Sequence, residues 1–326
     1  MRDDAGAGGA EEQAAAKEGR TPKQLTVVSA NLEELYDVVD NAQPGDLKMF
    51  AKRVSEVVPS IPDVVLLQEV LSSGSRTVAK ALSDVFGVPF RVVVTPGATP
   101  YSSQTVTQET VRDTAILINS KTMKVKRRGG FVATRQDSKD GAADSPKNKA
   151  KEHAYMLATH IASKVDVALM SVHLIPNRWL MSKDTGYQLR GRWVKELVDF
   201  LRAEYPPSKH LIHVMGGDFN NDRTTGRHER VDTDVHPFWT ALTEECGMTD
   251  AVFRKHGGSN KAIREQSRRG EKDGRRIDYI FTDAEVFEAS HDLDYSAQRG
   301  DPEWYADHRL LWATLKLPKG APRRKS

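Results

Sequence analysis

The order of short apolar runs along the chain is the feature that most constrains its fold. Some β-like runs follow one another after only a few residues, as residues 153–162 and 166–174 do. Others, such as 25–31 and 63–70, are separated by a stretch whose apolar residues have helical spacing. Neighbouring runs predict hairpins, and the separated runs are joined through helices. This mixture indicates two β-sheets packed on each other with helices outside, rather than one doubly wound parallel sheet.

The spacing of apolar residues also predicts where the individual elements lie. The helices are expected at 46–58, 76–87, 184–206 and near 236–246. The third helix has leucines and a tryptophan on one face and stops at Pro206, and the second ends at Gly87. The strands are expected at 25–31, 63–70, 90–96, 113–120, 153–162, 166–174, 210–217, 276–282 and 308–317.

The two ends of the chain differ in composition from its middle. Residues 1–24 are mainly Ala, Gly and charged residues with almost nothing to bury, which predicts a disordered tail. Residues 318–326 form a basic tail. The segment 25–317 is expected to be one domain, interrupted by polar insertions at 127–152 and 254–276 that are expected to be surface loops.

Composition excludes some classes of protein. The chain has 326 residues, 38% of them hydrophobic, which is typical of a globular protein, and its net charge of +3 favours no partner by its total. The single cysteine, Cys246, excludes an internal disulfide and is expected to be a partly buried thiol. No apolar run reaches the length of a membrane span, and the N-terminus lacks the apolar segment of a Sec signal. We therefore expect a cytoplasmic protein, or one exported by a non-Sec route.

Polar residues lie at or near one end of the predicted strands at six places. These residues are Asn31, Glu69, His173, Asp218 with Asn220, Asp278, and Asp307 with His308. Glu69 follows a fully apolar run, where an acid is costly unless it is paired or binds a metal. Oxygen ligands without cysteine suit Mg²⁺ or Mn²⁺ better than zinc. The set therefore indicates a metal site with acid–base groups.

Each of these positions has a structural interpretation when it is taken alone. Asn31 is then a turn residue, and His173 is a buried core histidine. Arg276 and Asp278, two residues apart, are then a structural ion pair.

The run that begins at Asp218 also resembles a calcium-binding loop. Asn220 and Asp222 follow at alternate positions, and Glu229 stands at the twelfth. Two features count against calcium. Arg223 occupies the place of the glycine that the sharp turn needs, and a β-like run rather than a helix precedes the loop.

Six ordered motifs resemble those of the endonuclease/exonuclease/phosphatase superfamily, the DNase I-like enzymes. They are Asn31, "LLQEV" with Glu69, "SVHLIPN" with His173, "GGDFNND" with Asp218 and Asn220, "RIDYIF" with Asp278, and "ADHRLL" with Asp307 and His308. Each motif alone is weak, but six in this order over residues 25–317 are specific. The resemblance implies a four-layer α/β sandwich, in which two packed mixed β-sheets are flanked by helices. It also implies Mg²⁺-dependent hydrolysis of phosphoric esters.

The resemblance implies roles for the acids and amides. Glu69 corresponds to the main metal ligand, and Asn31 and Asp307 correspond to residues that complete or support the Mg²⁺ site. Asp218 and Asn220 correspond to the pair that orients the attacking water and binds the scissile phosphate. Because they are two residues apart, we expect their side chains to point the same way, as on one face of a strand.

The resemblance also implies roles for two histidines. His308 and Asp278 correspond to the His–Asp pair at the phosphate, and His173 corresponds to a second histidine found in DNase I and sphingomyelinases. DNase I gives that second histidine an acidic partner, for which this sequence offers Glu109 or Asp113.

The substrate is indicated less directly. Asn177 and Lys151 resemble substrate-binding positions, and the two glycines Gly216 and Gly217 are expected to allow a close approach at the end of their strand. The basic segment 254–276 runs directly into the Asp278 motif. Such charge suits a polyphosphate backbone, although the acids within the segment also fit a solvated face.

We therefore predict a Mg²⁺-dependent endonuclease that acts as a monomer on nucleic acid, with DNA favoured over RNA. Mn²⁺ is the second candidate cation. The alternative is a phosphodiesterase or phosphatase acting on a lipid or a small phosphorylated substrate. The tryptophan that usually precedes "GD" in the superfamily's inositol phosphatases is replaced by Met215 and Gly216, and the sequence has no apolar anchor of the kind a membrane sphingomyelinase needs.

Overall fold

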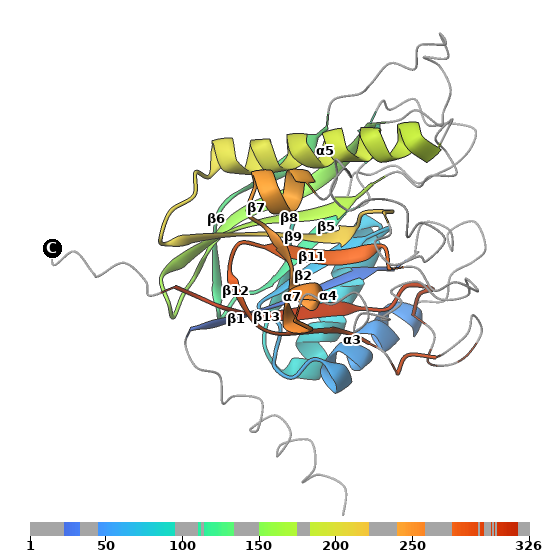
Figure 1. Cartoon of the computed structure of the whole chain (residues 1–326). Helices are drawn as coiled ribbons and strands as arrows, with labels where there is room; N and C mark the ends of the chain where they lie inside the picture. The colour runs from blue at the N-terminus through green and yellow to red at the C-terminus, as the bar shows by residue number, and fades with distance from the viewer. Residues whose placement is uncertain are drawn as a thin grey trace, which may run out of the picture.

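The computed structural model places four layers on one another (Figure 1). Helices α3 and α4 form one outer layer, two β-sheets form the middle, and helix α5 covers the far side. The residues that the structure describes are 23–32, 45–94, 110–111, 114–133, 150–174, 183–221, 240–257, 276–292, 294–296, 301, 303 and 305–318. The prediction of two packed mixed sheets flanked by helices is confirmed.

The first sheet has the strand order β12-β13-β1-β2-β5-β3. Its strands are β1 (Gln24–Asn31), β2 (Val64–Gln68), β3 (Phe90–Val94), β5 (Ala115–Asn119), β12 (Glu285–His291) and β13 (Leu311–Lys316). Strands β1 and β2 are parallel, and the other neighbours are antiparallel. The predicted N-terminal tail is one residue too long, because Gln24 is the first residue of β1.

The second sheet has the order β10-β11-β9-β8-β7-β4, and β6 also pairs with β7. Its strands are β4 (Thr110–Val111), β6 (Met123–Val132), β7 (Ala150–His160), β8 (Val165–His173), β9 (Leu211–Asp218), β10 (Thr249–Asp250) and β11 (Asp278–Thr282). Strands β8 and β9 are parallel, and β11 runs antiparallel to β9.

The helices lie mainly where the sequence predicts them. They are α3 (Gly45–Val57), α4 (Ser72–Phe86), α5 (Lys183–Glu204), the π-helix η5 (Thr240–Glu245) and α7 (Ala251–Lys255). Helix α4 ends at Gly87, whose φ of +64° is the left-handed conformation that terminates helices. Cys246 follows η5 and is buried. No helix among these described elements is long and apolar enough to cross a membrane.

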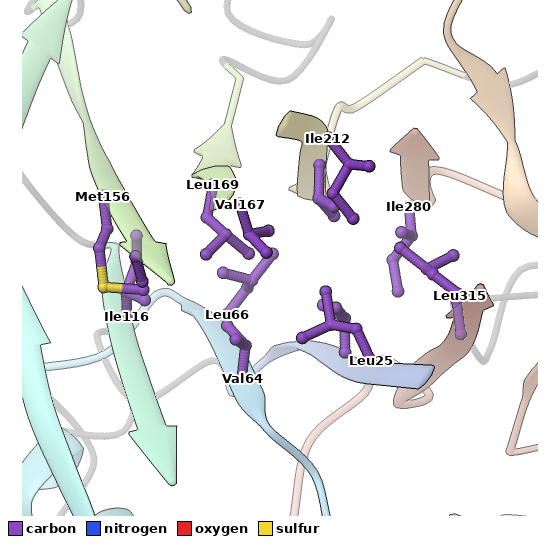
Figure 2. Close-up of a cluster of buried hydrophobic side chains, with 14 of the residues drawn as sticks. Leu25, Val64, Leu66, Ile116, Met156, Val167, Leu169, Ile212, Ile280 and Leu315 are labelled. Atoms are coloured by element: carbon purple, nitrogen blue, oxygen red, sulfur yellow. The ribbon is translucent and has the colours of Figure 1, made fainter. Parts of the chain in front are cut away.

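The main hydrophobic core lies between the two sheets (Figure 2). Strand β2 explains why its sequence is apolar at every position. Val64 and Leu66 point into the space between the sheets, whereas Val65 and Leu67 pack against the outer layer of α3 and α4. A strand buried on both faces has no polar alternation, and complete burial of one such side chain contributes roughly 1.5–3 kcal/mol.

One predicted loop is wrong. Residues 127–132 belong to strand β6 and residues 150–152 to strand β7, and Gly129 serves packing rather than a turn. A Cβ atom at Gly129 would lie 2.7 Å from the hydroxyl oxygen of Tyr155, whose ring covers the strand. Phe131, two residues later, stacks on Phe200 of α5 with the ring centroids 4.2 Å apart.

The strand directions determine where the polar strand ends meet. Strands β1 and β2 are parallel, as are β8 and β9, so Asn31 pairs with Gln68 and His173 pairs with Asp218. Strands β11 and β13 run the opposite way and bring their amino ends to this edge, where Asp278 pairs with Asp218. One edge of the sandwich therefore collects residues from the whole chain.

Candidate functional site

The first group of site residues joins the two sheets. The side-chain amide of Asn31 donates through Nδ2 to Oε1 of Glu69 at 3.0 Å and to Oδ2 of Asp218 at 3.2 Å. Nε2 of His173 lies 3.3 Å from the same Oε1 of Glu69. Glu69, His173 and Asp218 each offer a ligand atom, and these atoms lie within 4.8 Å of one another. The group has the donors and spacing of a metal site.

The second group shares Asp218 with the first. Nδ1 of His308 lies 2.8 Å from Oδ2 of Asp278, and its Nε2 lies 4.0 Å from Oδ2 of Asp218. Ligand atoms of Asp218, Asp278 and His308 also lie within 4.8 Å of one another. Asp307 belongs to neither group among the described residues, but its Oδ1 lies 3.5 Å from Nε2 of His308.

Burial and charge shift the pKa values at the shared carboxylate and its histidine. Burial, reinforced by the Asp278 carboxylate, raises the pKa of Asp218 to about 6. Burial alone would lower the pKa of His308, but the carboxylates of Asp278, Asp307 and Asp218 outweigh it and hold that pKa well above its usual range. The site therefore combines a carboxylate that can take up a proton near neutral pH with a histidine that holds its proton.

The residues fit a divalent cation. Oε2 of Glu69 is buried and has no hydrogen-bond partner among the described residues. A second buried acid, Asp218, lies nearby and shares the amide of Asn31 with Glu69. Two buried carboxylates in contact with one amide are costly unless a positive charge compensates them. Glu69 and Asp218, supported by Asn31, are the residues that would hold this cation.

No family model matches the sequence, and no curated protein matches it. Solved structures do match over nearly the whole chain. An endonuclease/exonuclease/phosphatase from Bacteroides vulgatus is 14% identical, with a TM-score of 0.59 over 91% of this chain and 100% of that one. A mannosyl-6-phosphatase from Bacteroides thetaiotaomicron is 16% identical, with a TM-score of 0.58 over 89% and 99%. D. rerio TDP2, solved with a single-strand DNA product, is 14% identical, with a TM-score of 0.56 over 90% and 99%.

These matches decide the architecture. The chain has the endonuclease/exonuclease/phosphatase fold. The resemblance that the ordered motifs carry is thus confirmed at the level of the fold, and the candidate site lies where four carboxyl strand ends of that fold meet.

Within the endonuclease/exonuclease/phosphatase fold, the two glycines before Asp218 make room for neighbouring strands. A Cβ atom at Gly217 would lie 1.8 Å from the carbonyl oxygen of Val172 on β8, and one at Gly216 would lie 2.7 Å from Cδ1 of Leu66 on β2. The expected close approach is therefore confirmed. Its partners are β8, the neighbouring strand that ends at His173, and β2 of the facing sheet, which ends one residue before Glu69.

The predicted reason for placing Asn220 beside Asp218 is wrong. Strand β9 ends at Asp218, and Asn220 has a φ of +49°, so strand alternation does not extend to it. Instead, the backbone N–H of Asn220 donates to Oδ1 of Asp218 at 2.7 Å. Its side-chain Nδ2 donates to the carbonyl of Leu174 at 2.8 Å. A tight turn holds the two residues together.

Other supporting residues were not predicted. Gln68 donates through Nε2 to Oγ of Ser171 at 2.9 Å, and Ser171 donates to the carbonyl of Leu67 at 2.9 Å, so a buried polar bridge joins the sheets beside Glu69. Nδ1 of His153 accepts from the backbone N–H of His173 at 3.3 Å. The sequence signal for this bridge was Gln68, a side-chain amide at the end of an otherwise apolar run.

The proposed structural pair of Arg276 with Asp278 is wrong in its partner. Arg276 lies against Asp250, with Nη2 2.6 Å from Oδ1, and both side chains are completely buried. Asp278 instead contacts His308. In this motif, Arg276 forms a buried ion pair away from the site, and Asp278, two residues later, contacts a site histidine.

Several predicted residues lie outside the described part of the chain. These are Asn177, Glu109, Asp113, Asp222 and Glu229, together with residues 258–275 of the basic segment and nearly all of both predicted tails. Lys151 lies in β7, where its backbone pairs with Val111, but its side chain is not among those described. The structure does not support the calcium-loop alternative, because a strand that ends at Asp218 stands where such a loop needs a preceding helix.

Proposed function

We propose that the protein is a metal-dependent phosphodiesterase, and more specifically a Mg²⁺-dependent endonuclease that favours DNA. The observation that carries the proposal is the position of Asp218, which is shared by a carboxylate-rich cation site and a His–Asp pair. Phosphodiester hydrolysis requires a cation near the phosphate, a base for water and an acid for the leaving oxygen. These requirements match the two groups.

The cation site would be formed by Glu69, Asp218 and Asn31, and Asp307 would support it from beside His308. Carboxylate and amide oxygens suit Mg²⁺, with Mn²⁺ as a second candidate. When bound, such a cation supplies positive charge against the negative charge that develops on the phosphoryl oxygens.

The protein's own residues supply the proton chemistry. Asp218, which lies between the two groups, orients the attacking water and accepts its proton. Asp278 fixes the orientation of the His308 ring, whose protonated Nε2 then donates a hydrogen bond to a phosphoryl oxygen. The water oxygen bonds to phosphorus, the ester bond breaks, and His173 provides the proton to the leaving oxygen.

The choice of DNA rests on charge and on one similar protein. The basic segment 254–276 precedes Asp278, and a phosphate backbone is bound mainly through positive charge. The similar structure of D. rerio TDP2 contains a single-strand DNA product, which supports a nucleic acid substrate. The mannosyl-6-phosphatase favours the alternative, a small phosphorylated substrate.

A substrate panel tests the proposal. The purified protein is incubated with plasmid DNA, RNA, an abasic oligonucleotide, sphingomyelin and mannose 6-phosphate, each with Mg²⁺ or with EDTA. We expect nicking or fragmentation of DNA that depends on Mg²⁺ and is abolished by EDTA. Turnover of the lipid or the sugar phosphate alone would overturn the nuclease assignment, and turnover of every substrate in EDTA would overturn metal dependence.

A further inference from the structure

The loop that carries Asp307 and His308 has no regular secondary structure. It runs from Tyr305 to Leu310, directly before β13. Backbone N–H and C=O groups that are buried outside helices and sheets need other hydrogen-bond partners. In this loop, two tyrosine hydroxyls meet that need.

Tyr295 holds the first end of the loop. Its hydroxyl accepts from the backbone N–H of Tyr305 at 2.8 Å and from that of Ala306 at 3.4 Å. The same hydroxyl donates to the carbonyl of Ala306 at 3.2 Å. A tyrosine hydroxyl has one donor and can accept two bonds, so one side chain satisfies three backbone groups immediately before Asp307.

Tyr305 holds the second end. Its hydroxyl accepts from the backbone N–H of Leu310 at 2.9 Å, immediately after the segment that contains His308. The rings of Tyr295 and Tyr305 stack with centroids 4.2 Å apart, and Phe50 of α3 meets Tyr305 edge-on at 5.7 Å. Both tyrosines are buried, so packing fixes the two hydroxyls.

We propose that Tyr295 and Tyr305 form a tyrosine clamp, a pair of positioning residues that sets His308 against Asp278 and Asp218. The inference rests on the proposed function. Nε2 of His308 lies 4.0 Å from Asp218 across the two sheets, so the loop's position decides the distance between these groups. Displacement of a reacting group by about 1 Å can reduce the rate roughly 10²-fold.

The test removes one hydroxyl at a time and leaves each ring in place. The variants are Tyr305→Phe and Tyr295→Phe. The matched control is Tyr205→Phe, because Tyr205 is also buried but its hydroxyl has no hydrogen-bond partner among the described residues. The readouts are kcat and KM for bis-p-nitrophenyl phosphate with Mg²⁺, measured well below the midpoint of thermal unfolding.

We expect kcat to fall roughly fivefold in Tyr305→Phe, the fold-change that corresponds to one neutral hydrogen bond, with KM unchanged. The fall should be larger in Tyr295→Phe, because that hydroxyl makes three such bonds. The control should keep the wild-type kcat. A lower unfolding temperature with an unchanged kcat would mean that the tyrosines only stabilise the fold, and would overturn the proposal. An equal loss of kcat in the control would overturn it as well.

Amide hydrogen exchange separates this proposal from the function on which it rests. If the wild-type protein shows no Mg²⁺-dependent turnover of any phosphodiester, the proposed function fails. Exchange of the backbone amides at residues 305–310 then still reports on the clamp. Faster exchange in Tyr305→Phe than in Tyr205→Phe supports the clamp, and equal exchange in the two variants overturns it.

Discussion

Strand β2 has a buried acid at each end, and the two acids differ in how they are bonded. Oδ2 of Asp63 accepts from the backbone N–H of Thr26 at 2.7 Å, and the backbone of Asp63 bonds to Thr26 and Asn119 on the two neighbouring strands. Glu69, at the other end, has a φ of +49° and a buried Oε2 without a partner among the described residues. The first acid completes the sheet, whereas the second keeps one buried oxygen that no described residue contacts by a hydrogen bond.

The two ends of strand β11 repeat the contrast, because each has an aspartate paired with a histidine. At the end away from the site, Nδ1 of His213 lies 2.7 Å from Asp283, and its Nε2 lies 2.8 Å from the carbonyl of Tyr205. At the site end, Nδ1 of His308 has a similar 2.8 Å contact, but its Nε2 faces carboxylates. One pair ties elements together, and the other leaves a ring nitrogen directed at the site. Close pairing of histidine with aspartate is thus common to both pairs, and they differ in what the second ring nitrogen faces.

The largest expected effect comes from removing the two acids of β2 separately. Glu69→Ala should lower kcat/KM roughly 10³-fold or more, because it removes a cation ligand, with little change in the free energy of unfolding without metal. Asp63→Ala should keep its activity but lose about 1.5–3 kcal/mol of stability, because a charged hydrogen bond to a buried N–H is lost. Enzyme kinetics and thermal denaturation check both, and a comparable activity loss in Asp63→Ala at low temperature would remove the contrast.

The two His–Asp pairs provide the next comparison. His308→Ala should reduce the rate about 10²–10⁴-fold while the protein remains folded, because a group that acts on protons or charge is lost. The free energy of unfolding of His213→Ala should fall by about 2–4 kcal/mol and its rate per folded molecule should be unchanged, because one buried and one partly buried contact are removed. Circular dichroism reports the folded fraction. A fully active His308→Ala protein would exclude His308 from the mechanism.

Metal binding should distinguish the two acids at the ends of strand β2, Asp63 and Glu69, without an assay of catalysis. Mg²⁺ at about 100 times its dissociation constant should raise the free energy of unfolding by about 2.7 kcal/mol. EDTA should reverse the gain. The gain should persist in Asp63→Ala and disappear in Glu69→Ala, as followed by thermal denaturation across a Mg²⁺ titration. Stabilisation of both variants to the same extent would place the cation elsewhere.

Much of the fold could be predicted from local patterns. The apolar run of β2 and the helical spacing in α5 reflect burial against fixed neighbours, and the order of polar strand ends predicted which residues gather at one edge. Strand β6 was missed because Gly129 is required by the ring of Tyr155, a contact between strands that no local pattern shows.

The supporting residues of the site could not be predicted for the same reason. Gln68 meets Ser171, and Tyr295 meets Tyr305, only after the sheets and loops have formed. We expected the side chains of Asp218 and Asn220 to point the same way because the strand would continue past Asp218. The strand ends there, and a turn at Asn220 follows. Sequence patterns thus locate the residues of the proposed site better than the residues that hold them in position.

The smallest expected effect is the pH dependence of stability that Asp218 causes in the absence of metal. Its pKa is raised to about 6 in the folded protein, whereas an unfolded aspartate has a pKa of about 3.9. The stability that Asp218 contributes is therefore fully present below about pH 4 and is lost as the pH rises through about 6. His308, with a pKa raised well above 6.5, keeps its proton across this window.

Comparison with Asp218→Asn isolates this contribution. The stability of the wild type relative to the variant should decline between about pH 4 and pH 6, as measured by urea denaturation in EDTA. Because a cation competes with the proton on Asp218, the apparent affinity of the wild type for Mg²⁺ should rise over the same range. A stability difference that is constant with pH, or one that grows, would show that the pKa of Asp218 is not raised in the metal-free folded protein.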